Sequence, residues 1–426
     1  MGGHGGQVLQ LQISPSSTRM IGPDMPSCVI VVENLPVPFD RRVWQEACAL
    51  RDAGWQVSVI CPKTEQYPEK FEIIDDIEIF RHPLPLEARG KLAFIAEYSV
   101  ALFYEFTLLF KVLRRRGFDV IQACNPPDLI FLVAFPFKLL GKSFVFDHHD
   151  VSPELYVAKY ERRGFFYHLL KLAERLTFLT ADLVISSNET HRELAMSRGG
   201  KKADDVVSVY SIPDKSRIRR VAPNLELRGG ARVVLGYVGI IADQDGVDHL
   251  VRCLHQLVKV HAVHDIKAVV VGDGPALESV RSLAAELQIE DFVKFTGYLR
   301  GEQLLAALST FDIGIIPDPV NEYNDKISMN KVFEYSALGI PSVSYDLRET
   351  KRLLKSAGRY ADAPTPEALA KACLTLIRDD MARAEAGHRA KALADADFNW
   401  DHEAQKYVTA YSRFLKQEEV SLQTGA

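Results

Sequence analysis

The feature that most constrains this chain is a regular alternation of short apolar runs with longer amphipathic runs. In the first half, β-branched runs at 28–34 (CVIVVEN) and 55–62 (WQVSVICP) flank segment 40–54, whose apolar residues recur at helical spacing and which stops at Gly54. Buried parallel strands have nearly continuous apolar runs, and strands separated by helices require right-handed crossovers. The alternation therefore predicts an α/β chain with a doubly wound parallel sheet.

The alternation weakens between about residues 205 and 230 and then restarts, with strand-like runs at 232–240, 266–274, 292–298, 311–317 and 340–346. A chain of 426 residues also exceeds one ordinary hydrophobic core. The sequence thus predicts two Rossmann-like domains and a final amphipathic helix after the second. The expected divisions are a disordered leader 1–26, an N-terminal domain 27–208, a linker 209–231, a C-terminal domain 232–398, a helix 400–416 and a disordered tail 417–426.

Composition excludes several classes of function. A formal net charge of −5 gives no basic field for nucleic acid. The six cysteines are scattered without a C-x-x-C pair, which favours free thiols in a reducing, cytoplasmic compartment over disulfides or a zinc site. The leader lacks the pattern of a signal peptide. The most apolar long segment, 92–113, carries Glu97, Glu105 and Lys111, so we expect an amphipathic or buried helix there.

Two glycine-bearing turns follow strand-like runs in the second half. In VVVGDGP (269–275), Gly272 and Asp273 precede an expected helix, and Gly239 ends another strand. Glycines permit close backbone approach and a helix N-terminus attracts anions, so either turn could hold a phosphate. The alternative is a tight turn with capping aspartates, and Asp243 and Asp245 favour that role after Gly239 because carboxylates repel phosphate.

A polar cluster ends the strand-like run 144–154 (FVFDHHDVSPE). It contains Asp147, His148, His149 and Asp150. An imidazole beside a carboxylate can accept a proton or hold a hydroxyl, and strand ends are where α/β domains bind ligands. A metal site is disfavoured because adjacent histidines on a strand point to opposite faces. The alternative is a pair of exposed or core-satisfied histidines.

The segment NDKISMNKVFEYSALGIP (324–341) collects charge at an expected helix start. With Ser328 as N-cap, the first amides would be open to an anion, and Lys326 and Lys331 would add two cations suited to a diphosphate. Asn330 and Glu334 share a helix face, so Glu334 could bind hydroxyls one turn further in. The alternative is two surface ion pairs, one between Lys331 and Glu334 and one between Lys326 and the glutamate four residues earlier.

Four runs together resemble the family 4 glycosyltransferases of the GT-B fold, over about residues 28–415. They are NKVFEYSALGIPSV, VGDGPALESVRSLAAEL, VKFTGYL and DRRVWQEACALRDAGWQVSVI. The resemblance implies two domains facing across a cleft, with a nucleoside-diphosphate sugar on the C-terminal one and the acceptor on the N-terminal one. It also implies a final helix that returns to the N-terminal domain, and retaining transfer with neither a metal ion nor another cofactor.

The resemblance also assigns residues of the donor site. It places the ribose hydroxyls at Glu334, whereas Lys326 stands where the family has a glutamate that contacts the sugar. Ile240 and Asp245 replace the family's basic pair, which leads to the hypothesis that Lys326 and Lys331 bind the diphosphate instead.

The remaining assignments concern the sugar, the base and the acceptor. His149, with Asp150 beside it, corresponds to the histidine expected near the donor sugar and acceptor hydroxyl. Tyr298 corresponds to the region that contacts the base. In the glycine-free loop 34–42, Asp40 or Arg41 is expected to reach the acceptor.

These patterns predict a glycosyltransferase acting on a saccharide or lipid-linked acceptor in polysaccharide or glycolipid assembly. A nucleotide-sugar epimerase of the same fold and a non-catalytic sugar-nucleotide-binding protein remain alternatives. Basic residues beside aromatic and leucine residues at 92–117 and 161–176 suggest contact with the inner membrane surface. Ordinary core helices with solvated basic ends would explain those two runs equally well.

Overall fold

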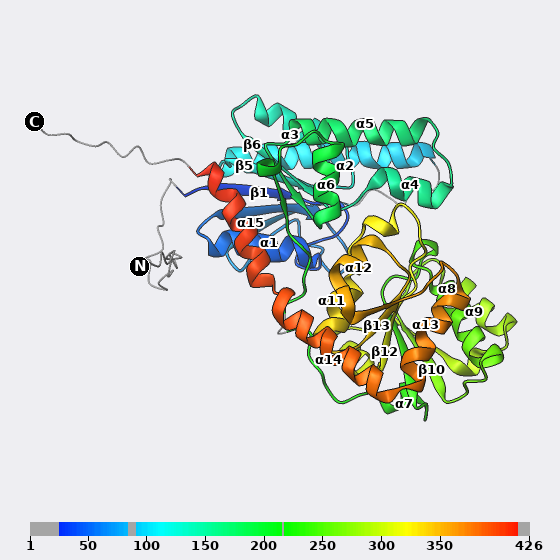
Figure 1. Ribbon diagram of the computed structural model, residues 1–426. Helices are drawn as coiled ribbons and strands as arrows, with labels where there is room; N and C mark the ends of the chain where they lie inside the picture. Colours follow the sequence, from blue (N-terminus) through cyan, green and yellow to red (C-terminus); the bar gives the residue numbers. More distant parts are fainter. Residues whose placement is uncertain (1–24, 84–90, 215–216, 416–426) are drawn as a thin grey trace, which may run out of the picture.

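The computed structural model describes residues 25–83, 91–214 and 217–415, which form two α/β units stacked end to end (Figure 1). Each unit is built on its own sheet, one of eight strands and one of six. The prediction of two doubly wound parallel sheets is confirmed. The leader and the tail predicted to be disordered lie almost wholly outside the described residues.

The first sheet has the order β3-β4-β2-β1-β5-β6-β7-β8. Every pair of neighbours is parallel except β3 and β4. Its strands are β1 Ser27–Val31, β2 Gln56–Pro62, β3 Phe71–Ile74, β4 Ile77–His82, β5 Val120–Cys124, β6 Ser143–His148, β7 Leu183–Ser186 and β8 Val206–Ser208.

Helices cover both faces of this sheet. One face buries α1 and the final helix α15 (Trp400–Tyr411), and the other buries α2, α3 and α5. The helices of the unit are α1 Arg41–Asp52, α2 Lys91–Arg115, α3 Phe131–Lys138, α4 Ser152–Tyr160, α5 Phe165–Thr180, α6 Glu189–Ser197 and the 3₁₀ turn η1 Ala203–Asp205. No helix in the described residues is long and apolar enough to span a membrane.

The second sheet is parallel throughout, in the order β11-β10-β9-β12-β13-β14. Its strands are β9 Val233–Val238, β10 Ile266–Val271, β11 Val293–Gly297, β12 Ile313–Ile316, β13 Ser342–Ser344 and β14 Gly358–Tyr360. Its helices are α7 Leu225–Arg228, α8 Val247–His255, α9 Leu277–Glu286, α10 Gly301–Ser309, α11 Asn330–Ala337, α12 Arg348–Leu354, α13 Pro366–Arg378 and α14 Asp380–Asp397. Shorter helical turns are η2 Asp243–Asp245, η3 Gln256–Val260 (a π-turn), η4 Glu290–Phe292, η5 Asn324–Lys326, η6 Lys355–Ala357 and, after α15, η7 Ser412–Phe414.

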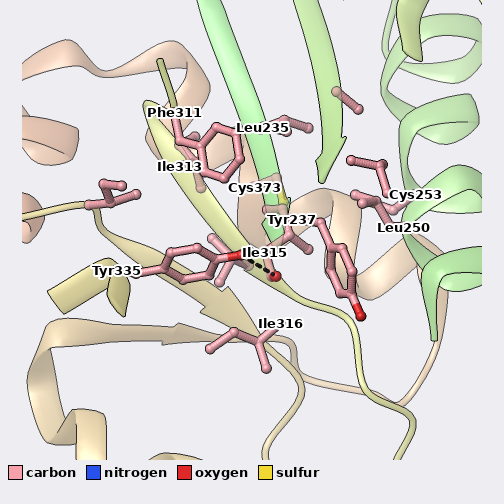
Figure 2. Close-up of a cluster of buried hydrophobic side chains, with 14 of the residues drawn as sticks. Leu235, Tyr237, Leu250, Cys253, Phe311, Ile313, Ile315, Ile316, Tyr335 and Cys373 are labelled. Carbon is pink, nitrogen blue, oxygen red and sulfur yellow. Dashed lines mark hydrogen bonds between the residues drawn. The ribbon is translucent and has the colours of Figure 1, made fainter. Parts of the chain in front are cut away.

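Tyr335 fixes helix α11 to the second sheet (Figure 2). Its ring is fully buried, and its hydroxyl lies 3.2 Å from the carbonyl oxygen of Gly236 and 3.5 Å from that of Ile315. The ring fits because β12 has a glycine beneath it: a Cβ on Gly314 would lie 2.4 Å from the tyrosine. The charged residues at the start of α11 are therefore carried on a rigidly positioned helix.

The chain passes between the two units twice. The first passage is the segment between β8 and β9, and the second is the short step from α14 to α15. Helix α14 packs against α11 of the second unit, whereas α15 packs against α1 and β8 of the first (Figure 1). The last helix thus returns to the N-terminal sheet and buries Tyr407 and Tyr411 there.

Candidate active site

The strand order reverses between β1 and β5 in the first sheet and between β9 and β12 in the second. Ligands of such sheets bind at the carboxyl ends of the strands on either side of this point. Contacts across the two units lie near these ends. Arg41 Nη1 is 3.6 Å from Glu334 Oε1, Asn188 Nδ2 donates to the carbonyl of Lys326 at 2.9 Å, and Lys326 Nζ is 3.6 Å from Glu154 Oε1.

His149 follows β6 and is held by a buried charged network. Its Nε2 lies 2.7 Å from Asp147 Oδ2 and 3.0 Å from Nε of Arg42. A protonated Nε2 donates to the carboxylate, and an unprotonated one accepts from the guanidinium. Arg42 also binds Asp147 Oδ1 at 2.9 Å, Glu46 at 3.1 Å and the carbonyl of Val209 at 2.7 Å. The imidazole is fixed in orientation, and its side chain keeps 19% exposure.

Two fully buried carboxylates share this network with different charge states. Burial opposes ionisation of Asp147, yet Arg42 and then His149 hold the pKa of this carboxyl below its usual range. For Glu46, burial raises the pKa well above its usual range despite the attraction of Arg42, and the nearby Asp147 raises it further. The surroundings therefore favour ionisation of Asp147, the partner of Arg42 and His149, and oppose ionisation of Glu46.

Gln122 connects the same network to the last helix. Its side-chain amide nitrogen on β5 donates to Glu46 at 2.7 Å and to Asp147 at 3.1 Å. Its amide oxygen accepts hydrogen bonds from the hydroxyls of Tyr407, at 2.6 Å, and Tyr411. The sequence analysis did not identify Arg42, Glu46 or these tyrosines. The available signal was polar side chains inside two otherwise apolar strands, Gln122 in β5 and Asp147 in β6.

His148 points to the opposite face of β6, as expected for adjacent strand residues. It is fully buried, with its ring centroid 5.0 Å from that of Phe178 and 4.8 Å from that of His191, and its Nε2 lies 3.9 Å from Glu174. Burial lowers the pKa of His148 well below its usual range, so it is neutral. His148 is a core residue, and His149 is the histidine of the candidate site.

A cluster that could hold a metal ion lies at the same place. The ligand atoms of Cys124, Asp147 and His149 lie within 4.8 Å of one another. Arg42 contacts both the carboxylate and the imidazole, so its guanidinium already supplies the positive charge that a metal ion would bring. The donor set therefore fits a guanidinium better than a metal ion.

Asp150 is tied to the β5 loop through its backbone. Asn125 Oδ1 accepts from the amides of His149, at 2.7 Å, and Asp150, at 3.2 Å, and Asn125 Nδ2 donates to the carbonyl of Asp150 at 2.7 Å. Burial raises the pKa of the Asp150 carboxyl. Its negative charge also acts on Tyr323 of the second unit. Asp150 therefore lies where the two units meet.

The glycine turns of the second unit pack against each other. A Cβ on Gly272, whose φ is 146°, would lie 1.8 Å from the carbonyl oxygen of Gly239, and a Cβ on Gly274 would lie 2.3 Å from that of Ile241. The amide of Ile241 donates to the carbonyl of Asp273 at 3.0 Å. These glycines are thus required for contact between the two turns, and the same contact sets the shape of the expected donor pocket.

Asp245 follows the Gly239 turn, and its carboxylate is attracted by the charge of Lys331. The carboxylate of Asp245 accepts from the amide of Ala242 at 3.1 Å, so its capping role is confirmed. Burial raises the pKa of Asp245 to about 6, against the effect of Lys331. Lys331 is nearly buried, donates to Asp318 Oδ2 at 2.8 Å and lies 4.8 Å from the ring centroid of Tyr237. Lys331 does not form the surface pair with Glu334 that the alternative interpretation proposed.

The start of α11 differs from the prediction. The helix begins at Asn330, and Met329 occupies the N-cap position without a side-chain cap bond, so Ser328 is not the cap. The hydroxyl of Ser328 is buried and has no hydrogen-bond partner in the described residues. The apolar side chain of Met329 is anchored in the core and cannot accept from the first amides of the helix, and the amide of Val332 donates to the carbonyl of Met329 at 3.0 Å. Lys326 donates to the carbonyl of Glu322 at 2.7 Å and keeps 21% side-chain exposure.

Glu334 lies one turn further along α11 and faces the first unit. It is nearly buried, and burial raises the pKa of its carboxyl, whereas Arg41 lowers it. Arg41 is half exposed and is the first residue of α1. Asp40 caps α1 by accepting from the amide of Val43 at 3.1 Å. The cap uses one carboxylate oxygen of Asp40 and turns Arg41 toward Glu334.

The other predicted donor residues lie apart from these contacts. Tyr298 follows β11, the edge strand of the second sheet, and is 62% exposed. Asn330 is exposed at the start of α11. A cavity of about 480 Å³ lies elsewhere, beside the linker and the far end of α11, and its lining includes Arg220, Leu338 and Gly387. The candidate site is thus defined by side chains at the strand ends and not by this cavity.

Comparison with known proteins gives the family. The profile "Glycosyl transferase 4-like domain" matches residues 40–209, and the profile "Glycosyl transferases group 1" matches residues 232–379. The chain is 26% identical over 363 residues to a 2-deoxystreptamine glucosyltransferase of Streptomyces kanamyceticus. The aligned residues cover 80% of this chain and 89% of the relative.

Solved structures agree on the fold. The sucrose-phosphate synthase of Thermosynechococcus elongatus superposes with a TM-score of 0.74 at 16% identity, covering 91% of this chain and 98% of the other. HepE of Anabaena, in complex with UDP-glucose, gives 0.68 at 18% identity, covering 91% and 99%. Between them the two family profiles span well over half of the chain, one for each unit. The chain therefore belongs to the group 1, family 4 glycosyltransferases of the GT-B fold, which transfer a sugar from a nucleotide sugar.

Proposed function

We propose that this glycosyltransferase moves a hexose from a nucleoside-diphosphate sugar to a saccharide or lipid-linked acceptor, with retention, in polysaccharide or glycolipid biosynthesis. The proposal rests on two contacts between the units near the strand ends. Lys326 in η5 contacts Glu154, and Glu334 in α11 contacts Arg41. The family profiles on both units favour transfer over the epimerase alternative. HepE binds UDP-glucose and the Streptomyces relative is a glucosyltransferase, so UDP-glucose is the first donor to test.

The donor diphosphate is assigned to the start of α11. The uncapped first amides and the lysines Lys326 and Lys331 supply positive charge where the leaving group develops negative charge. Lys331 is paired with Asp318, and Lys326 lies 3.6 Å from Glu154. Because lysines would serve the leaving group directly, we propose transfer without a metal ion, which predicts activity that resists EDTA.

The other donor groups follow from their positions. Glu334 is assigned to the ribose hydroxyls, and Tyr298, exposed after the edge strand β11, to the nucleobase. The turns at Gly239 and Gly272, which pack against each other, are assigned to the wall of the donor pocket, with the exposed Asp273 beside them.

The transferred sugar and the acceptor are assigned to the first unit. His149 is held through Nε2 by Asp147 and Arg42, so its Nδ1 edge is the one available to a sugar or acceptor hydroxyl. Asp150, with a raised pKa, lies beside it at the boundary between the units. Arg41 and Asp40 border the same space at the start of α1, and Arg41 is half exposed.

We also propose a cytoplasmic location at the inner face of the membrane. All six cysteines are free, and five are buried, an arrangement that suits a reducing compartment.

The test combines a donor panel with substitutions of the two lysines. Purified protein is incubated with nucleotide sugars, with and without membrane lipid extract, and release of free nucleoside diphosphate is followed. Acceptor-dependent release is expected, and Lys326→Ala together with Lys331→Met should lower kcat/KM by roughly 100-fold or more. Lys391→Met is the matched control, because this exposed lysine pairs with Asp395 within helix α14.

Folding and function are separated by measuring thermal unfolding of each variant. Lys326→Ala removes a partly exposed side chain and should unfold close to the parent protein. A folded Lys326→Ala, Lys331→Met variant with near-normal kcat/KM would exclude these lysines as the diphosphate site. Isomerised donor without an acceptor would exclude transfer altogether.

A further inference from the structure

Helices α2, α3 and α5 lie side by side on one face of the first sheet (Figure 1). Several of their large apolar side chains are exposed to solvent. We define their outer apolar face by Phe103 on α2, Leu132 and Phe135 on α3, Leu139 just after α3, and Phe165 and Leu172 on α5. These six side chains are 50% to 76% exposed. Soluble monomers rarely expose a contiguous apolar surface of this kind unless it binds something.

The core of the first unit does not account for this face. The inner sides of the same helices already fill the core with other residues, among them Leu109, Val133, Phe137 and Phe178, all nearly or fully buried. An ordinary surface helix has one apolar stripe toward the core and polar residues opposite. These three helices carry a second apolar stripe on the solvent side, which indicates a second apolar partner.

The charges on these helices are positive toward solvent. Arg114 lies 4.3 Å above the ring of Phe110, and Arg175 is exposed on α5. The carboxylates on these helices whose side chains the structure describes, Glu105 and Glu174, are both fully buried. The exposed charges described on these helices are therefore cationic, on a chain whose formal net charge is −5. A second copy of the chain would bring these cations together, whereas anionic headgroups complement them.

We propose that α2, α3 and α5 form a docking surface for an anionic phospholipid bilayer, with the aromatic and leucine side chains inserted between the headgroups. The inserted rings and the flanking arginines act together, because apolar insertion and headgroup attraction add in interfacial binding.

The docking surface continues to the candidate active site. The turn 161–164 joins α4 to α5 and is exposed along its length, with Phe165 at the start of α5. Arg163 in this turn forms an ion pair with Glu322 of the second unit, four residues before Lys326. A docked enzyme thus has the edge between its two units close to the bilayer. Resting on the proposed function, this placement selects the lipid-linked class of acceptor over a free saccharide.

The test is flotation of the purified full chain with phosphatidylcholine vesicles, with and without phosphatidylglycerol. Binding is expected only with the anionic lipid. The variant Phe103→Ser, Leu132→Ser, Phe135→Ser should partition on the order of 100-fold more weakly. Arg114→Gln together with Arg175→Gln should weaken binding about 30-fold and reduce its salt dependence. Met381→Ser and Leu225→Ser, at exposed positions on the second unit, should bind like the parent protein.

Two results would overturn the proposal. One is equal flotation of the parent protein and the triple serine variant, or no flotation of either. The other is a parent dimer in sedimentation that the serine variant converts to a monomer, which assigns the face to a second copy. Binding of UDP without vesicles is measured in parallel by calorimetry. Its absence in the parent protein would count against the proposed function and leave the docking result intact.

Discussion

Arg42 offers the sharpest test of the buried network, and we predict that Arg42→Met destabilises the first unit by about 3–5 kcal/mol. The substitution keeps the volume of the side chain but leaves Asp147, which is fully buried, without its guanidinium partner. The carbonyl of Val209 also loses its donor. Urea unfolding can be followed by tryptophan fluorescence, because the three tryptophans, Trp44, Trp55 and Trp400, all lie in elements that pack on the first sheet.

The pH dependence separates a lost charge pair from lost packing. In the parent protein Arg42 holds the folded-state pKa of Asp147 below its unfolded value, so this stabilisation is present at neutral pH and lost in acid. In Arg42→Met, burial raises that pKa above the unfolded value. The penalty is then present at neutral pH and is relieved as the pH falls toward the unfolded pKa.

The difference in unfolding free energy between Arg42→Met and the parent protein should therefore shrink as the pH falls toward the unfolded pKa of Asp147, by at most about 1.4 kcal/mol per pH unit. The control is Arg51→Met on the same helix, whose partner Asp52 is exposed, and its effect should stay within about 1 kcal/mol. A loss below about 1 kcal/mol for Arg42→Met, or a loss that does not change with pH, would refute the account of the network.

Two further predictions concern a buried histidine and a glycine. Burial lowers the pKa of His191 to about 4, so the folded state binds fewer protons than the unfolded state below pH 6.5. Keeping this histidine neutral should therefore cost about 3 kcal/mol of stability at pH 4. His191→Gln should flatten the fall of unfolding free energy between pH 6.5 and 4, and an unchanged slope would contradict this. Gly272→Ala should weaken UDP binding at least about tenfold in calorimetry, because its Cβ would overlap the Gly239 carbonyl. Gly54→Ala, with φ 89° and no atom within 4 Å of the added Cβ, should bind UDP normally. Equal affinities of the two variants would refute this prediction.

Much of the fold could be predicted from the sequence because the β-branched runs and helical spacings are long and regular. The elements that were missed are short or local. The β3–β4 hairpin turns at Asp75 and Asp76, whose φ values of 48° and 63° are those of a type I′ turn, and two aspartates signal that turn less clearly than Asn-Gly. The edge strands β8 and β14 have only three residues each, too few for a periodicity to show.

The site was predicted less completely because its contacts join distant parts of the chain. The strand-end position indicated the cluster that contains His148 and His149, and the family resemblance selected His149. Nothing local indicates that Arg42, one residue after the exposed Arg41, turns inward to Asp147. The predicted N-cap was also one residue early. Polar capping preferences favour Ser328, but Met329 takes the position and anchors in the core, so tertiary packing overrides the local preference.

The two passages of the chain between the units restrict how the cleft can open. Both passages lie near α11 and α14, so they act as a two-stranded hinge, and the units can rotate mainly about the line that joins them. Opening then separates most widely the contacts far from that line, Arg163 with Glu322 and Lys326 with Glu154. Arg163 and Glu322 are exposed and Lys326 is partly exposed, so these ion pairs hold the units together only weakly. Added salt should break them before it destabilises either core.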